Sequence, residues 1–304
     1  MEIQNFDYII IGAGPAGLAG AQYAARGGLK VIVLECSSAG GQVSQITELE
    51  NYPGVFPVIN GTDFIMTMQK QAETFGAQIK SVTVSSIDKS GSNFIIKTKD
   101  VEYHAPYICI ATGAVHRNLD VPGEKELTGR GVSYCAVCDG PFFKNKKIIV
   151  VGGGDSACSE AIYLSTISSD VTIIHRRDTF RAQKAVIDKM LACGVKTVFD
   201  SVIKSIDGST KVEGVTIENV KTGEKSSLSA DAVFVFTGMI PQTNLVEMLP
   251  KDEGGYIKTD ENMETPVPGL FAAGDVRSKA LRQIVTAVSD GAIAANTVVN
   301  RKNS

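Results

Sequence analysis

Cys135 and Cys138 are separated by two residues and followed by Asp139, and this C-x-x-C motif is the strongest candidate for chemistry in the sequence. Two intervening residues allow a small disulfide ring, and the thiolate form of a cysteine controls its reactivity. The pair therefore predicts a redox-active dithiol. Asp139 is either a general acid that delivers a proton to a leaving thiolate or a turn residue, and both assignments remain open.

Two other roles compete for the C-x-x-C pair. A zinc site needs two further ligands, but the sequence has no second C-x-x-C and only 3 histidines, so no metal is expected. A pair of buried, unreactive cysteines is the second alternative. That description fits other thiols better, because Cys109 lies in an apolar segment and Cys158 on a predicted helix.

Two glycine-rich stretches, residues 12–17 and 152–157, each follow a short β-branched run and precede a segment of small residues. This order predicts a strand, a tight turn and a helix whose N-terminus binds a pyrophosphate. One such match is weak evidence, whereas two in this context predict two dinucleotide sites; glycine turns without a ligand are the alternative. The cofactor-binding residues expected in the first turn are Gly12, Gly14, Pro15, Ala16 and Gly17, and those in the second are Gly152, Gly154, Asp155, Ser156 and Ala157.

The residue that closes the next strand distinguishes the two ligands. Glu35 can accept hydrogen bonds from ribose hydroxyls, as expected for an adenosine without a 2′-phosphate, so the first site takes FAD or NAD. The equivalent position of the second copy is basic, which suits a 2′-phosphate and therefore NADP. A solvated basic turn is the alternative. The basic residues are His175, Arg176, Arg177 and Arg181.

Two βαβ units must position these residues, and the chain has the elements for both. The first turn is flanked by strand-like runs at residues 8–11 and 31–34, and the second by runs at 148–151 and 171–174. The 304 residues suggest two domains, and the segment from Leu245 onward is too short for a third. The predicted fold is α/β, with two Rossmann-like dinucleotide-binding domains, the second inserted into the first. The expected boundaries are 1–116 and 245–304 for the first domain and 117–244 for the second.

Composition excludes several classes of protein. The 30 glycines exceed the ~21 expected from average usage, and two dinucleotide turns account for the surplus. The net charge is −3 without a Lys/Arg block, so nucleic acid is not an expected partner. Apolar runs are far shorter than the ~20 residues of a membrane span, so no membrane segment is expected. An N-terminus without a basic leader and only 6 cysteines favour the cytoplasm.

The order and spacing of the motifs, over essentially the whole length, resemble those of bacterial low-molecular-weight thioredoxin reductases. That family belongs to the FAD- and NADPH-dependent pyridine nucleotide-disulfide oxidoreductases. The resemblance implies an NADPH-dependent thioredoxin-disulfide reductase, a flavoprotein that acts as a homodimer on a thioredoxin-like protein. The motifs lie at residues 12–17, 40–42, 111–113, 135–140, 152–157, 175–182, 273–276 and 282–283.

The same resemblance implies roles for individual residues. Asp275 reaches the ribityl chain of FAD, and Ser156 lies near the pyrophosphate of NADPH. Cys138 faces the flavin, Cys135 attacks the partner's disulfide, and Asp139 is the proton donor. Further residues expected around FAD are Gly41, Gln42, Asn51, Thr112, Gly113, Gly274, Arg282 and Gln283.

The resemblance also implies a path for electrons, from NADPH to FAD, then to the Cys135–Cys138 disulfide and then to the partner. Nicotinamide and dithiol belong to one inserted domain and need the same flavin, so this domain is expected to rotate between two positions. Val137, where many relatives have threonine, is not expected to change the chemistry. The alternative function is a related flavin reductase that passes electrons to ferredoxin, flavodoxin or another thiol carrier.

Overall fold

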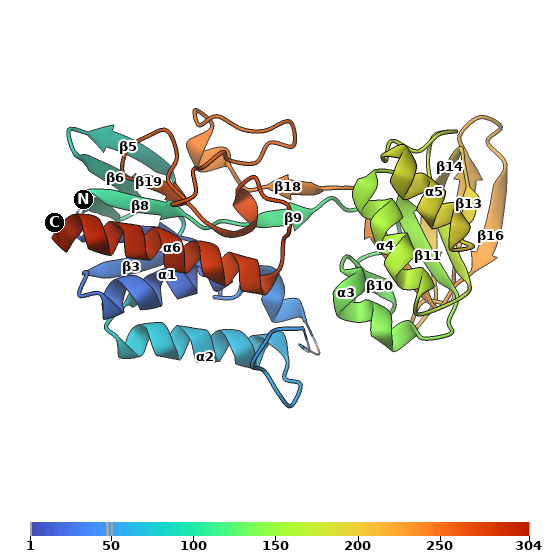
Figure 1. Ribbon diagram of the computed structural model, residues 1–304, viewed down its shortest axis with the longest axis horizontal. Helices are drawn as coiled ribbons and strands as arrows, with labels where there is room; N and C mark the ends of the chain where they lie inside the picture. Colours follow the sequence, from blue (N-terminus) through green and yellow to red (C-terminus); the bar gives the residue numbers. More distant parts are fainter. Residues whose placement is uncertain (1, 47–48, 50, 304) are drawn as a thin grey trace. The chain divides into compact units, whose positions relative to one another are not determined.

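The structure is a computed structural model that describes residues 2–46, 49 and 51–303. The chain forms two compact units: unit 1 comprises residues 1–115 and 240–304, and unit 2 comprises residues 116–239. Each unit contains a five-stranded parallel sheet with helices on one face, as Figure 1 shows. The predicted fold class, α/β with two Rossmann-like domains, one inserted into the other, is confirmed.

The chain passes between the units through β9 (Ala114–His116) and β18 (Met239–Pro241), which pair in a two-stranded sheet. The second crossing therefore lies earlier than residue 244, the position expected from the sequence. Hydrogen bonds explain this difference, because they tie the segment after β18 to unit 1. The Gln242 backbone N–H donates to the Gly113 carbonyl oxygen at 2.9 Å, and Thr112 Oγ1 donates to the Gln242 carbonyl oxygen at 2.6 Å.

The parallel sheet of unit 1 has the strand order β19-β8-β2-β3-β4. Its central strand is buried on both faces: Tyr8 and Ile10 pack toward the helices, and Ile9 and Ile11 pack toward a second sheet. Continuous apolar runs are what a parallel sheet covered on both faces requires. The strands are β2 (Tyr8–Ile11), β3 (Val31–Glu35), β4 (Gln78–Ser81), β8 (Tyr107–Ile110) and β19 (Leu270–Ala272).

Two layers cover this sheet. The helical layer holds α1 and α6 in close contact, since a Cβ at Gly291 would lie 2.0 Å from the Ala16 carbonyl oxygen. The other layer is a four-stranded sheet in the order β1-β7-β6-β5. The elements are α1 (Pro15–Arg26), α2 (Gly61–Thr74), α6 (Ile284–Asn303), β1 (Glu2–Asn5), β5 (Ser86–Ser90), β6 (Asn93–Lys97) and β7 (Val101–Ala105), with 3₁₀ turns η1 (Gly41–Gln45), η3 (Asn244–Val246) and η4 (Gly274–Val276).

Unit 2 repeats this three-layer plan. Its parallel sheet has the order β10-β17-β11-β12-β13, and an antiparallel sheet, β14-β15-β16, covers the face opposite the helices. The elements are β10 (Val132–Ser133), α3 (Ala136–Asp139), η2 (Gly140–Phe143), β11 (Ile148–Gly152), α4 (Asp155–Ser165), β12 (Val171–Ile174), α5 (Lys184–Ala192), β13 (Lys196–Val198), β14 (Ser201–Asp207), β15 (Gly214–Asn219), β16 (Lys225–Ser229) and β17 (Ala232–Phe236).

In each unit the central strand leads through a glycine-rich turn into a helix, β2 into α1 and β11 into α4. Ligands of open α/β sheets bind at the carboxyl ends of the strands, which is where both turns lie. Among the helices that the structure describes, none has the length and apolar character needed to cross a bilayer.

Candidate functional site

The first glycine-rich turn offers a free helix N-terminus. Gly12 has a φ of +106°, and a Cβ there would lie 2.4 Å from the Ala111 carbonyl oxygen, so glycine is required. A Cβ at Gly14 would meet nothing within 4 Å, and no side chain caps α1. The first N–H groups of α1 are therefore available to an anion such as a pyrophosphate. At the end of β3, Glu35 Oε2 accepts a hydrogen bond from the Ala13 N–H at 2.8 Å, which holds the carboxylate beside the turn.

A second group of predicted FAD residues lies in η4 and in the loop before α6. Asp275 follows Gly274, and its Oδ1 is buried without a hydrogen-bond donor among the described residues. Burial raises the pKa of Asp275, and the positive charge of Lys279 opposes that shift. The guanidinium of Arg282 lies 3.7 Å from the centre of the Tyr256 ring. A buried acceptor without a donor fits a hydroxyl of the FAD ribityl chain.

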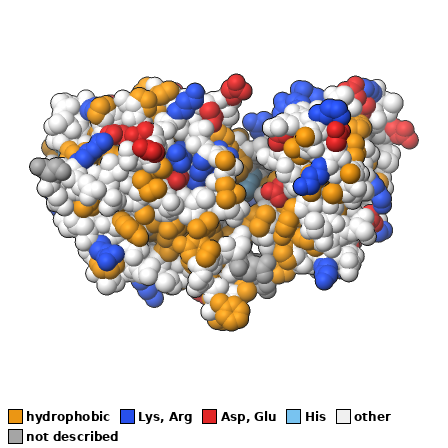
Figure 2. All heavy atoms as spheres, in the orientation of Figure 1, with side chains coloured by type: hydrophobic (Ala, Val, Ile, Leu, Met, Phe, Trp, Pro, Cys, Tyr) orange, Lys and Arg blue, Asp and Glu red, His pale blue; other side chains and the backbone are white. Residues whose placement is uncertain are grey.

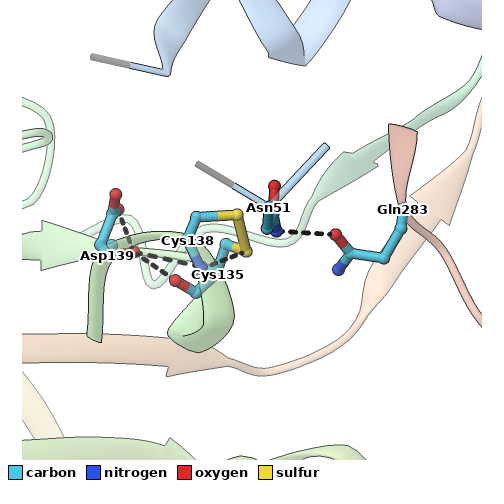
Figure 3. The surroundings of a disulfide bond; sticks show 6 residues. Asn51, Cys135, Cys138, Asp139 and Gln283 are labelled. Carbon is cyan, nitrogen blue, oxygen red and sulfur yellow. Dashed lines mark hydrogen bonds between the residues drawn. A yellow bond between two sulfur atoms is a disulfide. The ribbon is translucent and has the colours of Figure 1, made fainter. Parts of the chain in front are cut away.

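The other predicted FAD residues also lie in unit 1. The Gln42 side-chain amide donates to a backbone carbonyl in β9, and Asn51 Nδ2 donates to Gln283 Oε1 at 3.3 Å (Figure 3). Gly41 and Gly113 have φ values of +56° and +68°, a backbone conformation that favours glycine. The FAD-binding residues expected from distant parts of the sequence thus all lie in unit 1, which also contains the first glycine-rich turn and Glu35.

The second glycine-rich turn repeats the geometry of the first. Gly152 has a φ of +153°, and a Cβ there would lie 2.6 Å from the Phe236 carbonyl oxygen. A Cβ at Gly154 would meet nothing within 4 Å, and α4 also lacks a side-chain cap. Asp155 Oδ1 accepts from the Gln183 N–H at 2.8 Å, while Ser156 is exposed in the first turn of α4. This turn also has room for a pyrophosphate at the helix N-terminus.

His175 is part of the second turn's support. Its imidazole packs against Gly153, where a Cβ would lie 2.1 Å from His175 Nδ1, and it stacks on Phe180 with ring centroids 5.6 Å apart. Burial lowers the pKa of His175, and the neighbouring arginines lower it further, so the ring is held neutral. Gly153 belongs to the predicted glycine-rich turn, but it is not one of the residues expected to bind the cofactor.

Three predicted arginines carry the positive charge of this site. Arg176, Arg177 and Arg181 are exposed, and their guanidinium groups form no ion pair or hydrogen bond within the described part of the chain. The Arg181 backbone N–H donates to the Gly153 carbonyl oxygen at 2.7 Å, which fixes that arginine to the turn. Unpaired guanidinium groups next to a ribose position fit a 2′-phosphate.

The C-x-x-C motif forms a disulfide in unit 2. Cys135 follows β10 and stands at the N-cap of α3, and Cys138 lies in α3, with 5.3 Å between the two Cα atoms. The Cys138 backbone N–H donates to Cys135 Sγ at 3.2 Å (Figure 3). A hydrogen bond to sulfur favours the thiolate once the bond is reduced. The pair is therefore arranged for reversible chemistry at Cys135.

Asp139 is held next to the disulfide by a residue that the sequence did not identify. Ser133 Oγ donates to Asp139 Oδ2 at 2.6 Å and accepts from the Cys135 backbone N–H at 3.1 Å. Burial raises the pKa of Asp139, and the hydrogen bond from Ser133 opposes that shift. A carboxyl group whose pKa is raised is suited to donate a proton. No spacing rule marks Ser133, because its role depends on how β10 meets α3.

The four cysteines outside the motif differ from the pair. Cys109 and Cys158 are buried, and Cys36 and Cys193 are exposed. Burial raises the pKa of Cys109 to about 12 and that of Cys158 to about 11, which keeps both as neutral thiols. Within residues 2–46, 49 and 51–303, no group of three or more His, Cys, Asp or Glu side chains is placed to hold a metal ion.

Comparisons with known proteins agree with this arrangement. A family model described as pyridine nucleotide-disulphide oxidoreductase matches residues 6–291. A thioredoxin reductase of Treponema pallidum is 50% identical over 297 residues, covering 97% of each chain. A thioredoxin reductase of Bacillus subtilis is 45% identical over 300 residues, covering 98% of this chain and 95% of the relative. The crystal structure of thioredoxin reductase from Streptococcus pyogenes is 47% identical, covers 98% of each chain and has a TM-score of 0.92.

Two dinucleotide turns and a disulfide define a nucleotide-dependent disulfide oxidoreductase. The chain belongs to the pyridine nucleotide-disulphide oxidoreductase family. It is a flavoprotein oxidoreductase whose cofactors are FAD and NADPH. The resemblance to bacterial low-molecular-weight thioredoxin reductases, inferred from the motifs, is confirmed.

Proposed function

We propose that the chain is a thioredoxin-disulfide reductase that passes electrons from NADPH through FAD and the Cys135–Cys138 pair to a thioredoxin-like protein. The observation that carries this proposal is the disulfide itself, with Asp139 hydrogen-bonded beside it. The names of the relatives at 50% and 45% identity support thioredoxin as the class of partner.

When bound, NADPH would supply two electrons and a proton as a hydride equivalent, and FAD would relay the electrons to the disulfide. Unit 1 would hold FAD between the Gly12–Gly17 turn, Glu35 and Asp275, because the turn leaves helix N–H donors free and Asp275 Oδ1 is a buried acceptor without a donor among the described residues. Unit 2 would hold NADPH at the second turn, with the three unpaired arginines around the 2′-phosphate. Each cofactor thus has a site with some polar groups that the chain itself does not satisfy.

The chain's own residues carry the transfer to the partner. Reduction breaks the Cys135–Cys138 bond and leaves two sulfurs that together have gained two electrons. The Cys135 thiolate attacks the partner's disulfide and forms a mixed disulfide, and the displaced thiolate takes a proton from Asp139. Cys138 then attacks Cys135, which restores the original disulfide and releases the second partner sulfur as a thiol after it takes up a proton.

The assembly and surroundings of the protein are part of the proposal. Unit 2 rotates about β9 and β18, the two crossings that connect it to unit 1, and presents nicotinamide and dithiol to the flavin in turn. The protein acts as a cytoplasmic homodimer without nucleic acid or membrane partners. In support, Figure 2 shows Lys and Arg interspersed with Asp and Glu on the visible face, which is not the basic patch of a nucleic-acid-binding protein.

Anaerobic stopped-flow absorbance with NADPH and thioredoxin tests this function. In the wild type, the flavin should bleach with NADPH and recover its absorbance when oxidised thioredoxin is added. The variant Cys138→Ser should still bleach, because NADPH binding is untouched, but should lose thioredoxin-dependent recovery. The matched control is Cys193→Ser, which removes an exposed cysteine outside the disulfide.

Two outcomes would contradict the proposal. Thioredoxin reduction by Cys138→Ser at the wild-type rate would remove the dithiol from the electron path. Transfer of electrons from NADPH to ferredoxin or flavodoxin, without reduction of thioredoxin, would instead favour the related flavin reductases that pass electrons to those carriers. The Cys135–Cys138 disulfide argues for thioredoxin over those carriers, because a reductase of ferredoxin or flavodoxin needs no dithiol.

A further inference from the structure

Unit 1 contains a cluster of buried charges that none of the predicted motifs requires. Lys279 and Asp290 are each 8% exposed at the side chain, and Arg277 is 14% exposed. Arg277 and Lys279 lie in the loop after η4, and Asp290 lies on α6. Burying charges is costly unless each is paired and hydrogen-bonded, so the pairing of this cluster decides what it does.

Asp290 bonds to three donors from one short segment of chain. Its Oδ2 accepts from Lys279 Nζ at 3.0 Å and from the Gly274 backbone N–H at 3.0 Å, and its Oδ1 accepts from Arg277 Nη1 at 3.2 Å. Arg277 Nε donates in turn to Thr259 Oγ1 at 2.9 Å. The Asp290 carboxylate on α6 therefore holds the chain in place both before and after Asp275, the residue predicted to bind FAD.

Lys279 connects this carboxylate to Asp275. Its Nζ donates to Asp290 and, at 3.3 Å, to Thr286 Oγ1, and it lies 3.5 Å from Asp275 Oδ1 as an ion pair without a hydrogen bond. Asp275 Oδ1 thus faces a positive charge and still has its hydrogen-bonding capacity free. An acceptor that is held in place but unsatisfied is ready for a ligand hydroxyl.

We propose that the Lys279–Asp290 pair is the positioning device of the FAD site, holding Asp275 as an ionised acceptor for the ribityl chain. This positioning role depends on the proposed function in one respect: unit 1 must bind FAD. Lys279 and Asp290 do not themselves contact the flavin in this proposal; they act through Asp275 and the Gly274 backbone.

Charge balance explains why the pair matters. Asp275 and Asp290 carry two negative charges. Arg277 and Lys279 pair with Asp290. The positive charges of Lys279 and Arg282 act on Asp275. Without Lys279, Asp275 loses its ion pair and keeps only the more weakly acting charge of Arg282, so burial drives Asp275 toward its protonated form. A protonated carboxyl presents a hydrogen instead of a lone pair, so it no longer accepts from the ligand with the same strength.

Fluorescence titration of the apoprotein with FAD tests the proposal, because it measures cofactor affinity without any turnover. Lys279→Met removes the charge and keeps the length of the side chain, and we expect the Kd for FAD to rise about tenfold or more. Lys279→Arg keeps the charge and should bind FAD within about threefold of the wild type. Lys70→Met, which removes an exposed lysine from α2 of the same unit, is the matched control and should bind as the wild type does.

Urea unfolding of each apoprotein separates positioning from a structural role. A purely structural lysine would lower the stability of the apoprotein but leave the Kd of the folded fraction unchanged, and that result for Lys279→Met would overturn the proposal. If Lys279→Met fails to fold, the double variant Lys279→Met/Asp290→Asn removes one charge of each sign. Wild-type FAD affinity in that folded double variant would also overturn it. A wild-type apoprotein that binds no FAD would instead refute the proposed function.

Discussion

The two glycine-rich turns share a backbone plan but differ in what packs against their second residue. In unit 1 that residue is Ala13, and the Glu35 carboxylate reaches its N–H. In unit 2 it is Gly153, and the ring of His175 lies where a Cβ would stand, 2.1 Å from Nδ1. The second copy thus requires glycine at a position where the first accepts alanine.

This difference separates turn geometry from ligand choice. Both turns leave a helix N-terminus open for a pyrophosphate, so they do not distinguish the two cofactors. The distinction lies at the end of the next strand. Unit 1 has the carboxylate of Glu35 there, whereas unit 2 has the buried neutral ring of His175 followed by exposed arginines. Specificity for the 2′-phosphate therefore depends on the side chains that follow this strand, and the glycine-rich turn does not contribute to it.

The largest expected effect comes from removing charge at the second turn. Arg176→Ala/Arg177→Ala deletes two charge-assisted contacts to the 2′-phosphate, worth ~1.5–3 kcal/mol each. We expect the KM for NADPH to rise by about 100-fold or more, while the KM for NADH stays near its wild-type value. Steady-state kinetics with both nucleotides measure this directly.

Lys189→Ala controls for the loss of any exposed cation from unit 2, because Lys189 lies on α5 and has no ion pair among the described residues. Its KM for NADPH should not change. An equal rise in KM for NADPH and NADH in the double arginine variant would show that the arginines do not read the phosphate.

A smaller effect is expected from Gly153→Ala. The new methyl group meets the His175 ring, which cannot move without breaking its stack on Phe180, so unit 2 should lose about 1–3 kcal/mol of stability. Gly154→Ala is the matched control, since its methyl group meets nothing within 4 Å. Urea unfolding of the apoproteins measures both. Equal stability of the two variants would mean that the ring of His175 is not fixed against the turn.

The features that the sequence predicted well are local ones. A buried strand, a glycine turn and a helix lie next to one another in the chain, so both turns, Glu35 and the arginines could be placed from spacing alone. The Cys135–Cys138 pairing is local in the same sense. The fold class followed because each turn opens its own strand–turn–helix–strand unit, and because 304 residues suggest two domains.

The features that the sequence missed depend on how separate elements fold against one another, whether they are neighbours in the chain or far apart. Lys279 meets Asp290 only because α6 folds back on η4, and the sequence of that loop gives no period or motif for the contact. Ser133 meets Asp139 because β10 runs directly into α3. The position of the second crossing between the units depends on the hydrogen bonds of Gln242, which no composition shift marks.

The smallest expected effect is a pH dependence that only the second turn has. Burial, followed by the nearby arginines, holds the pKa of His175 below its ordinary value of 6.5. Below pH 6.5 the unfolded chain therefore binds more protons than the folded one, so the stabilising contribution is complete above pH 6.5 and is lost as the pH falls through the folded pKa.

His175→Asn cannot titrate, and the wild type should lose stability relative to it by at most ~1.4 kcal/mol per pH unit. Urea unfolding of both apoproteins from pH 7.5 to 5 measures the difference, and His116, whose pKa burial also lowers, is present in both and cancels. Parallel stability curves would show that the ring of His175 is not held neutral, which would remove this contrast between the two turns.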